Sequence, residues 1–186
     1  MPKKSNIFSV KTVIGYLIVF TGLLFVILGV AKEAERAYTF KNEPVEIQGF
    51  SEVVGDEKEI PTKITISEIY VELPVRKAEI IDGYWEVFEN SAGWGSGSGV
   101  PGEVGNQVIF AHARDGLFLP LLYVEKGMEI TVSTETETYV YEIMEIKEVY
   151  PNQIEVIQPT NTEILTLYTC SGFADKKRLI VTAKRI

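Results

Sequence analysis

The hydrophobic positions of this chain follow two different patterns, and the first lies near the N-terminus. Thr12–Ala31 is an uncharged run of twenty residues between Lys11 and Lys32. A run of this length is sufficient to cross a bilayer as an α-helix. A cleavable signal peptide is the alternative, but its apolar core is normally shorter and ends at a small-x-small site, whereas this run leads into Lys32 and Glu33. We therefore expect an uncleaved membrane anchor.

From residue 61 onward the pattern changes to short runs rich in β-branched and aromatic residues, separated by turn residues. Runs of this kind predict β-strands, and eight of them in this length are typical of a closed barrel. The expected strands are Lys63–Leu73, Ala78–Phe88, Gln107–Ala113, Met128–Ser133, Thr138–Val149, Gln153–Ile157, Ile164–Cys170 and Arg178–Lys184. We expect a mainly β fold, an eight-stranded β-barrel preceded by an N-terminal transmembrane helix.

The two patterns divide the chain into four parts. We expect a tail over residues 1–11, a transmembrane helix over 12–31, a stalk over 32–60 and a β-domain over 61–186. The stalk is charged, has no sustained periodicity and contains Pro44, Gly49 and Gly55, which is typical of a linker.

A Gly- and Ser-rich segment, Glu89–Asn106, interrupts the β-rich part of the chain. It resembles a flexible linker, but a domain boundary here would leave each half too small to bury a stable core. We therefore expect a long mobile loop on a single barrel.

Charge and cysteine content narrow the classes of function. The net charge is −8, and the first 31 residues contain three lysines and no acid, so the remainder carries −11. An acidic domain argues against binding to nucleic acid or anionic lipid through bulk electrostatics. The only cysteine, Cys170, cannot form an internal disulfide, so it is a free thiol or an intermolecular one.

The cysteine lies in the most informative stretch, Ile164–Ile186, where two apolar runs flank a polar segment. This pattern predicts two strands joined by an excursion. Alternation with a period of two places Leu165, Leu167 and Thr169 on one face, and Thr166, Tyr168 and Cys170 on the other. The aliphatic set is the better core candidate, so we expect Cys170 to point away from the core, near Arg178. A lone cysteine is more often a small buried hydrophobe, and for an arbitrary protein that is the favoured reading.

This stretch resembles the signature of the sortases, which are membrane-anchored cysteine transpeptidases. Their pattern is Thr-Leu-x-Thr-Cys, an irregular loop, and then Arg followed by aliphatic residues, matched here by Thr166–Cys170 and Arg178–Val181. The resemblance covers about residues 61–186 and the anchor, and it is greatest to the compact class D and E sortases. It implies the eight-stranded sortase barrel.

The only histidine, His112, stands at the end of an apolar run and before a polar turn. A lone histidine is more often structural than catalytic. Sortases, however, carry a catalytic histidine at the end of such a strand, after a Pro-Gly-x-x-Gly-Asn segment matched by Pro101–Asn106. The residues that usually follow are matched by Phe118, Leu121 or Leu122, and Gly127. The family's Gly-His-Arg is replaced by Ala-His112-Ala-Arg114, which weakens any assignment for Arg114 more than for His112.

The resemblance implies one chemistry for these residues. Cys170 would be the nucleophile, His112 the general acid and then the general base, and Arg178 the donor that stabilises the oxyanion. Thr169 would help to bind or orient substrate. An unperturbed thiol is only a few per cent thiolate at neutral pH, so the active Cys–His pair would be a minority of molecules.

The implied activity is cleavage of a Leu-Pro-x-Thr-Gly-like sorting signal of a surface or pilin protein through a thioacyl-enzyme. Transfer would be to an amine, from a cell-wall precursor or a pilin lysine. Basic residues flank the apolar run equally on both sides, so the positive-inside count is a tie, and the resemblance places the N-terminus in the cytoplasm and the domain outside. Two alternatives stay open, a hydrolytic cysteine peptidase and a non-catalytic, membrane-tethered binding module.

We expect no cofactor. One histidine, one cysteine and scattered acids give no metal-ligand cluster of recognisable spacing. Some sortases bind calcium through loop carboxylates, and the candidates here are Glu89, Glu103, Glu155 and Glu163, but solvated acidic loops are the simpler interpretation. The glycines near residue 97 lack the Lys-Ser/Thr that a phosphate-binding loop needs, and no nucleic-acid partner is expected.

Overall fold

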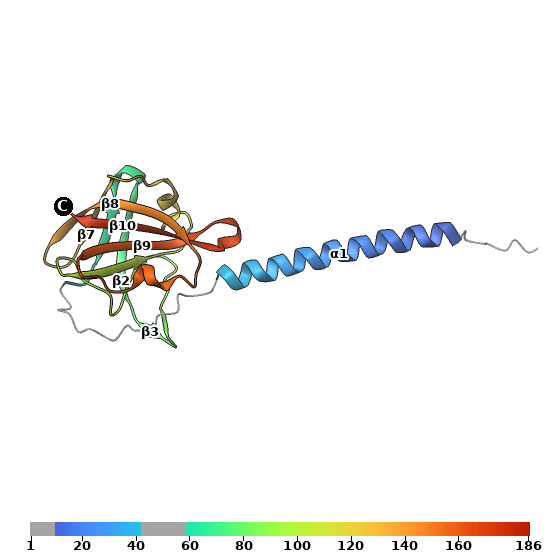
Figure 1. The fold of residues 1–186 in the computed structure, drawn as a ribbon, viewed down its shortest axis with the longest axis horizontal. Helices are drawn as coiled ribbons and strands as arrows, with labels where there is room; N and C mark the ends of the chain where they lie inside the picture. The colour runs from blue at the N-terminus through green and yellow to red at the C-terminus, as the bar shows by residue number, and fades with distance from the viewer. Residues whose placement is uncertain (1–9, 42–58) are drawn as a thin grey trace, which may run out of the picture. The chain divides into compact units, whose positions relative to one another are not determined.

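The computed structural model describes residues 10–41 and 59–186, which fall into two separate units (Figure 1). The first contains one α-helix, α1 (Val10–Lys41). Its segment Thr12–Ala31 has a mean hydropathy of 2.7, and none of it is buried in the protein. It is long and apolar enough to cross a membrane. Helix α1 continues past this segment into the expected stalk, whose remaining residues 42–58 lie outside the described residues, as do residues 1–9 of the expected tail.

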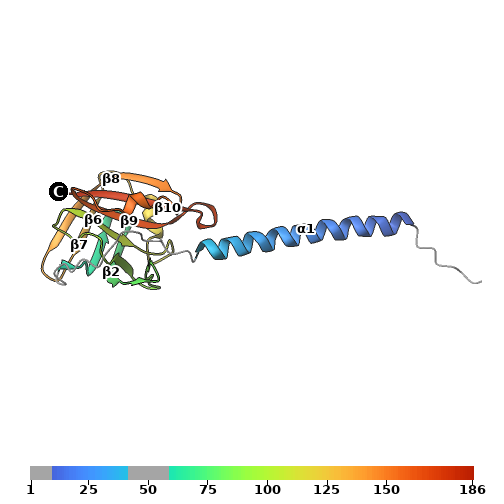
Figure 2. The same cartoon turned by 60° about the horizontal axis from the view of Figure 1, so that its bottom comes forward.

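The second unit is a closed barrel of eight strands in the order β1-β2-β5-β6-β9-β10-β8-β7 (Figures 1 and 2). Neighbouring strands are antiparallel except for the parallel pairs β2–β5 and β6–β9. The strands are β1 (Lys63–Ile66), β2 (Val71–Ala78), β5 (Ala92–Gly95), β6 (Gly105–Phe110), β7 (Glu129–Ser133), β8 (Thr138–Val149), β9 (Glu163–Ser171) and β10 (Lys177–Arg185). The predicted mainly β, eight-stranded barrel is confirmed.

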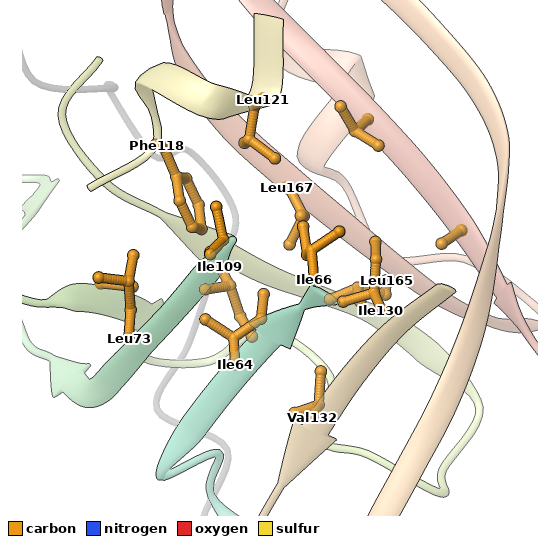
Figure 3. Close-up of a cluster of buried hydrophobic side chains, with 14 of the residues drawn as sticks. Ile64, Ile66, Leu73, Ile109, Phe118, Leu121, Ile130, Val132, Leu165 and Leu167 are labelled. Carbon is orange, nitrogen blue, oxygen red and sulfur yellow. The ribbon is translucent and has the colours of Figure 1, made fainter. Parts of the chain in front are cut away.

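Aliphatic side chains from alternate strand positions fill the barrel interior (Figure 3). Leu165 and Leu167 from β9 face this core, as predicted, and both are fully buried. Phe118 and Leu121, at the 3-10 helix η3 (Leu119–Tyr123), close part of the same cluster, whereas Leu122 is 47% exposed. Burying one such side chain stabilises a fold by about 1.5–3 kcal/mol, so this interior is the main source of barrel stability.

Two expected strands are divided by turns. The expected strand Lys63–Leu73 reverses direction at the 3-10 helix η2 (Ser67–Ile69) and Tyr70, whose φ is 56°, so β1 and β2 pair with each other as a hairpin. The expected strand Ala78–Phe88 is interrupted at Asp82 and Gly83, with φ of 53° and 84°, which leaves the small hairpin of β3 (Ile80–Ile81) and β4 (Tyr84–Trp85). The expectation of continuous strands was wrong at both places. The first turn contains no glycine or proline, whereas the second contains an Asp-Gly pair, a hairpin signal that the expectation of one continuous strand overlooked.

Another expected strand, Gln153–Ile157, is the 3-10 helix η4 (Ile154–Ile157). Short apolar runs do not distinguish a strand from a helical turn by periodicity. Ile157 is 1% exposed, and the segment is held by Asn106, whose Nδ2 donates to the carbonyls of Val156 (3.2 Å) and Gln158 (3.1 Å). Tertiary contacts therefore fix the conformation here.

The expectation of a mobile loop over Glu89–Asn106 was also wrong, because this segment contains the buried strand β5. A Cβ on Gly93 would lie 2.9 Å from the ring of Phe110, and one on Gly95 would lie 2.5 Å from the ring of Trp85. Glycine is required at these positions because aromatic rings occupy the space of a side chain.

The wall formed by β6, β9 and β10 is buried on both faces. A second apolar group, here called the outer cluster, lies on the face away from the barrel interior and consists of Ala78, Trp85, Phe88, Val108, Phe110, Val149, Ile157, Tyr168 and Ile180. Its Trp85 and Phe110 rings stack with centroids 5.6 Å apart. Polar groups on this face are therefore partly removed from water.

Candidate active site

Strand β9 presents Cys170 on the outer face of the barrel wall. Tyr168, two positions earlier, belongs to the outer cluster, whereas Leu167 belongs to the interior, so the predicted alternation is confirmed. Cys170 is a free thiol of intermediate exposure. It is therefore accessible at the surface while one side rests against the protein.

Strand β10 brings Arg178 directly opposite Cys170 in the antiparallel register. Opposite residues of such a pair share a face, with Cβ atoms about 4.5–5.5 Å apart. Arg178 is 1% exposed and is the largest fully buried side chain of the described residues. Its Nε donates to the Tyr168 hydroxyl (2.8 Å), and its Nη1 donates to the carbonyls of Asp175 (2.7 Å) and Lys177 (3.0 Å).

Strand β6 runs parallel to β9 on its other side and brings His112 to the same face. Phe110 pairs with Tyr168, so continuing this register by two residues sets His112 beside Cys170. The amide of Ala111 donates to the Tyr168 carbonyl (3.3 Å), which extends the pairing past the end of the strand. The chain then turns, because the amides of Arg114 and Phe118 both donate to the His112 carbonyl at 3.0 Å.

Thr169, between Tyr168 and Cys170, is 1% exposed. Its hydroxyl donates to the carbonyl of Ala111 at 2.8 Å. The register thus places Arg178 opposite Cys170 and, continued past the end of β6, His112 beside Cys170. Thr169 ties the strand of Cys170 to the segment that carries His112.

A carboxylate that the sequence did not single out for catalysis also reaches the site. Glu89 Oε1 lies 3.9 Å from His112 Nε2, and its Oε2 accepts a 2.6 Å hydrogen bond from Arg114 Nη1. The Glu89 side chain is 80% exposed, so this contact is well solvated. The only sequence signal was its place at the start of the Gly- and Ser-rich segment.

Three features of its surroundings shift the pKa of the Cys170 thiol. Burial is the largest and raises the pKa of Cys170, the positive charge of Arg178 lowers it, and the carboxylate of Asp175 raises it. The net effect is a pKa above the usual range, so the neutral thiol predominates at neutral pH. Asp175 has a φ of 57° in the 3-10 helix η5 (Phe173–Asp175), so it is a turn residue that also places a charge near the thiol.

Metal-binding groups are not assembled in the part of the chain that the structure describes. Within residues 10–41 and 59–186, no three His, Cys, Asp or Glu side chains are grouped to hold an ion. Of the loop acids considered for calcium, Glu163 accepts hydrogen bonds from the Tyr141 hydroxyl and the Gly102 amide, both at 2.8 Å. The absence of a cofactor stays a prediction.

Comparison with known proteins identifies the family of this chain. A family model described as the sortase domain matches residues 64–186. The chain belongs to the sortase family. Curated relatives include sortase A of Streptococcus agalactiae, 31% identical over 133 residues that cover 65% of this chain and 51% of that protein. Sortase A of Bacillus anthracis is 28% identical over 135 residues, 69% of this chain and 60% of that protein. The chain therefore spans about half to three fifths of these relatives.

Solved structures show the same fold. A Clostridium perfringens sortase described as a transpeptidase has a TM-score of 0.58 at 30% identity, covering 67% of this chain and 77% of that one. Sortase C of Streptococcus pneumoniae has a TM-score of 0.62 at 24% identity, covering 81% of this chain and 84% of that one. With α1, membership of this family supports a membrane-anchored protein.

Proposed function

We propose that this protein is a cysteine transpeptidase that cleaves a Leu-Pro-x-Thr-Gly-like sorting signal after its threonine. The observation that carries the proposal is the convergence of Cys170, His112 and Arg178 on one face of β6, β9 and β10. A nucleophile, a proton carrier and a cationic donor are the groups that amide cleavage through a thioacyl-enzyme needs.

In the first half-reaction, the Cys170 thiolate attacks the threonine carbonyl and forms an S–C bond. The electron pair displaced to the carbonyl oxygen gives an oxyanion, which the Arg178 guanidinium stabilises. When the intermediate collapses, the C–N bond breaks and the His112 imidazolium transfers its proton to the departing amine. A thioacyl-enzyme and a neutral His112 remain.

In the second half-reaction, an acceptor amine attacks the thioacyl carbon. His112 takes a proton from this amine, a new amide bond forms, and the C–S bond breaks to release the Cys170 thiolate. The starting charges of the pair are thereby restored. Water in place of the amine gives hydrolysis by the same steps.

The positions of Thr169 and Glu89 fit roles beside the reacting groups. The Thr169 hydroxyl holds the Ala111 carbonyl and so fixes the backbone from which His112 projects. The Glu89 carboxylate lies 3.9 Å from Nε2 of His112, the proposed proton donor of the first half-reaction. We expect Thr169 to contribute to substrate binding through this placement of His112.

The implied partners are the sorting-signal segment of a surface or pilin protein and an amine from a cell-wall precursor or pilin lysine. We propose that the N-terminus is cytoplasmic and that the barrel lies outside the membrane. Protease added to intact cells should then remove the barrel, and a protected barrel would contradict this orientation.

The test of function uses the full chain in detergent with a panel of sorting-signal peptides and triglycine as the amine. We expect a transpeptidated product whose yield rises with triglycine, and none from Cys170→Ala. Product formed only with water, at every triglycine concentration, would identify a hydrolase. No turnover of any peptide, while iodoacetamide still labels Cys170, would reject this substrate class.

A further inference from the structure

Tyr168 lies where it can act on Arg178. It is two residues before Cys170 on β9 and on the same face, and its hydroxyl oxygen accepts the 2.8 Å hydrogen bond from Arg178 Nε. Its side chain is 9% exposed and packs within the outer cluster. The phenol is therefore held by surrounding side chains and offers its oxygen from a fixed position.

The hydrogen bonds to Arg178 constrain the direction in which its guanidinium points. A guanidinium is planar, and its donors point in fixed directions within that plane. Tyr168 holds the Nε edge, while the Asp175 and Lys177 carbonyls, at the start of β10, hold Nη1. Anchoring at two different nitrogens fixes both the tilt and the rotation of the group beside Cys170.

The chemical nature of the group that accepts the hydrogen bond from Arg178 Nε matters as much as its position. A carboxylate at this place would orient the arginine but would also neutralise the charge that a developing oxyanion needs. Burial raises the pKa of Tyr168 to about 12, with the Arg178 charge acting in the opposite direction, so the phenol stays neutral wherever a Cys–His pair functions. A neutral acceptor orients the guanidinium without cancelling its charge.

We propose that Tyr168 is a positioning residue that holds Arg178 in its orientation beside Cys170. The inference rests on the proposed function, in which Arg178 stabilises the oxyanion. Replacing Tyr168 by phenylalanine removes one hydroxyl and keeps the ring in the outer cluster. Because a net hydrogen bond contributes about 1 kcal/mol, we expect about a fivefold lower kcat on a Leu-Pro-x-Thr-Gly peptide, with KM little changed.

The deciding readout is the pH dependence of Cys170 alkylation by iodoacetamide in the full chain in detergent. Cys170 is the only cysteine, so the reagent reports on one thiol. The ionisable groups that face it are Arg178 from β10, Asp175 from η5, Tyr168 from β9 and His112 beyond β6. Tyr168→Phe should shift the midpoint to higher pH and slow alkylation about threefold at neutral pH, because a loosened guanidinium stabilises the thiolate less.

Tyr141→Phe is the matched control. Tyr141 is also buried, and its replacement by phenylalanine also removes a hydrogen-bonded hydroxyl. Tyr141 pairs with Arg185, which is seven residues along β10 from Arg178, about 23 Å at 3.3 Å per residue. It should lower the unfolding temperature without moving the alkylation midpoint. A midpoint that moves equally in both variants would show a general loss of packing and overturn the inference.

A double-mutant cycle separates the inference from the proposed function. Arg178→Gln should raise the midpoint pH of Cys170 alkylation, and adding Tyr168→Phe should then cause no further shift. If Arg178→Gln raises the midpoint and Tyr168→Phe alone does not, the role of Tyr168 is wrong and that of Arg178 stands. If neither variant moves it, Arg178 does not act on Cys170, and the proposed function loses its oxyanion donor. Should Arg178→Gln fail to fold, comparison of Tyr168→Phe with Tyr141→Phe still decides the inference.

Discussion

The two faces of β9 are both buried, but they make different kinds of contact. On the inner face, Leu165 and Leu167 contact other aliphatic side chains and need only to fill volume. On the outer face, the polar side chains have directional partners: Thr166 donates to Asn106 Oδ1 at 2.7 Å, and Tyr168 accepts from Arg178. A strand buried on one side by packing can therefore hold polar groups rigidly on the other, and changes on the two faces should separate stability from activity.

Removing the thiol should have the largest effect on activity. Cys170→Ala deletes one atom at a partly exposed position, so we expect no detectable transpeptidation and an unfolding temperature close to that of the parent chain. The comparison needs peptide turnover and thermal unfolding on the same preparation. Turnover above background in the folded variant would show that another group is the nucleophile.

Replacing the buried guanidinium should have the second-largest effect on activity. Arg178→Lys keeps the charge but cannot reproduce the bonds to Tyr168 and to the Asp175 and Lys177 carbonyls, because an ammonium is a point donor. We expect kcat to fall by about 10²-fold or more, as when an oxyanion donor is lost. Steady-state kinetics on folded protein measures this, and a kcat near the parent value would remove Arg178 from the mechanism.

An inner-face change should reverse the balance between activity and stability. Leu167→Ala leaves a cavity in the barrel interior, and we expect about 2–5 kcal/mol of lost stability. Below the unfolding transition, turnover per folded molecule should be nearly unchanged. Chemical denaturation and active-site titration would check both parts, and a specific loss of kcat in the folded fraction would contradict the separation of the two faces.

The smallest change concerns the thiol's acidity. The carboxylate of Asp175 raises the pKa of Cys170, so Asp175→Asn should move the alkylation midpoint to lower pH and speed labelling at neutral pH. Asparagine also tolerates the positive φ at this position, so the turn should persist. An unchanged midpoint, or one moved to higher pH, would show that the Asp175 charge does not reach the thiol.

The sequence predicted the strands that have long alternating patterns. Thr138–Val149 matches β8 at both ends, and the strands carrying Cys170 and Arg178 were correct to within one residue. The prediction failed at β5, because a Gly-rich segment is also typical of a loop. The reason for Gly95 is the Trp85 ring against it, and that contact exists only in the folded barrel.

For the candidate site, the sequence identified the motif residues but not the contacts around them. Motif residues identified Cys170, His112 and Arg178, whose roles stay predictions, and the structure places all three on one face. The contacts of Tyr168 and Glu89 were missed because they depend on strand register and loop path. Tyr168 occupies the variable position of the motif, so nothing in its spacing indicated that it would bond Arg178.

The most direct test of the central claim is intact-mass measurement of the full chain after incubation with sorting-signal peptides in the absence of an added amine. We expect an adduct with the mass of the peptide up to its threonine, located on Cys170 by fragmentation and discharged when triglycine is added. Absence of an adduct on every peptide, together with Cys170 that resists iodoacetamide in the folded chain, would contradict the catalytic account and favour a tethered binding module.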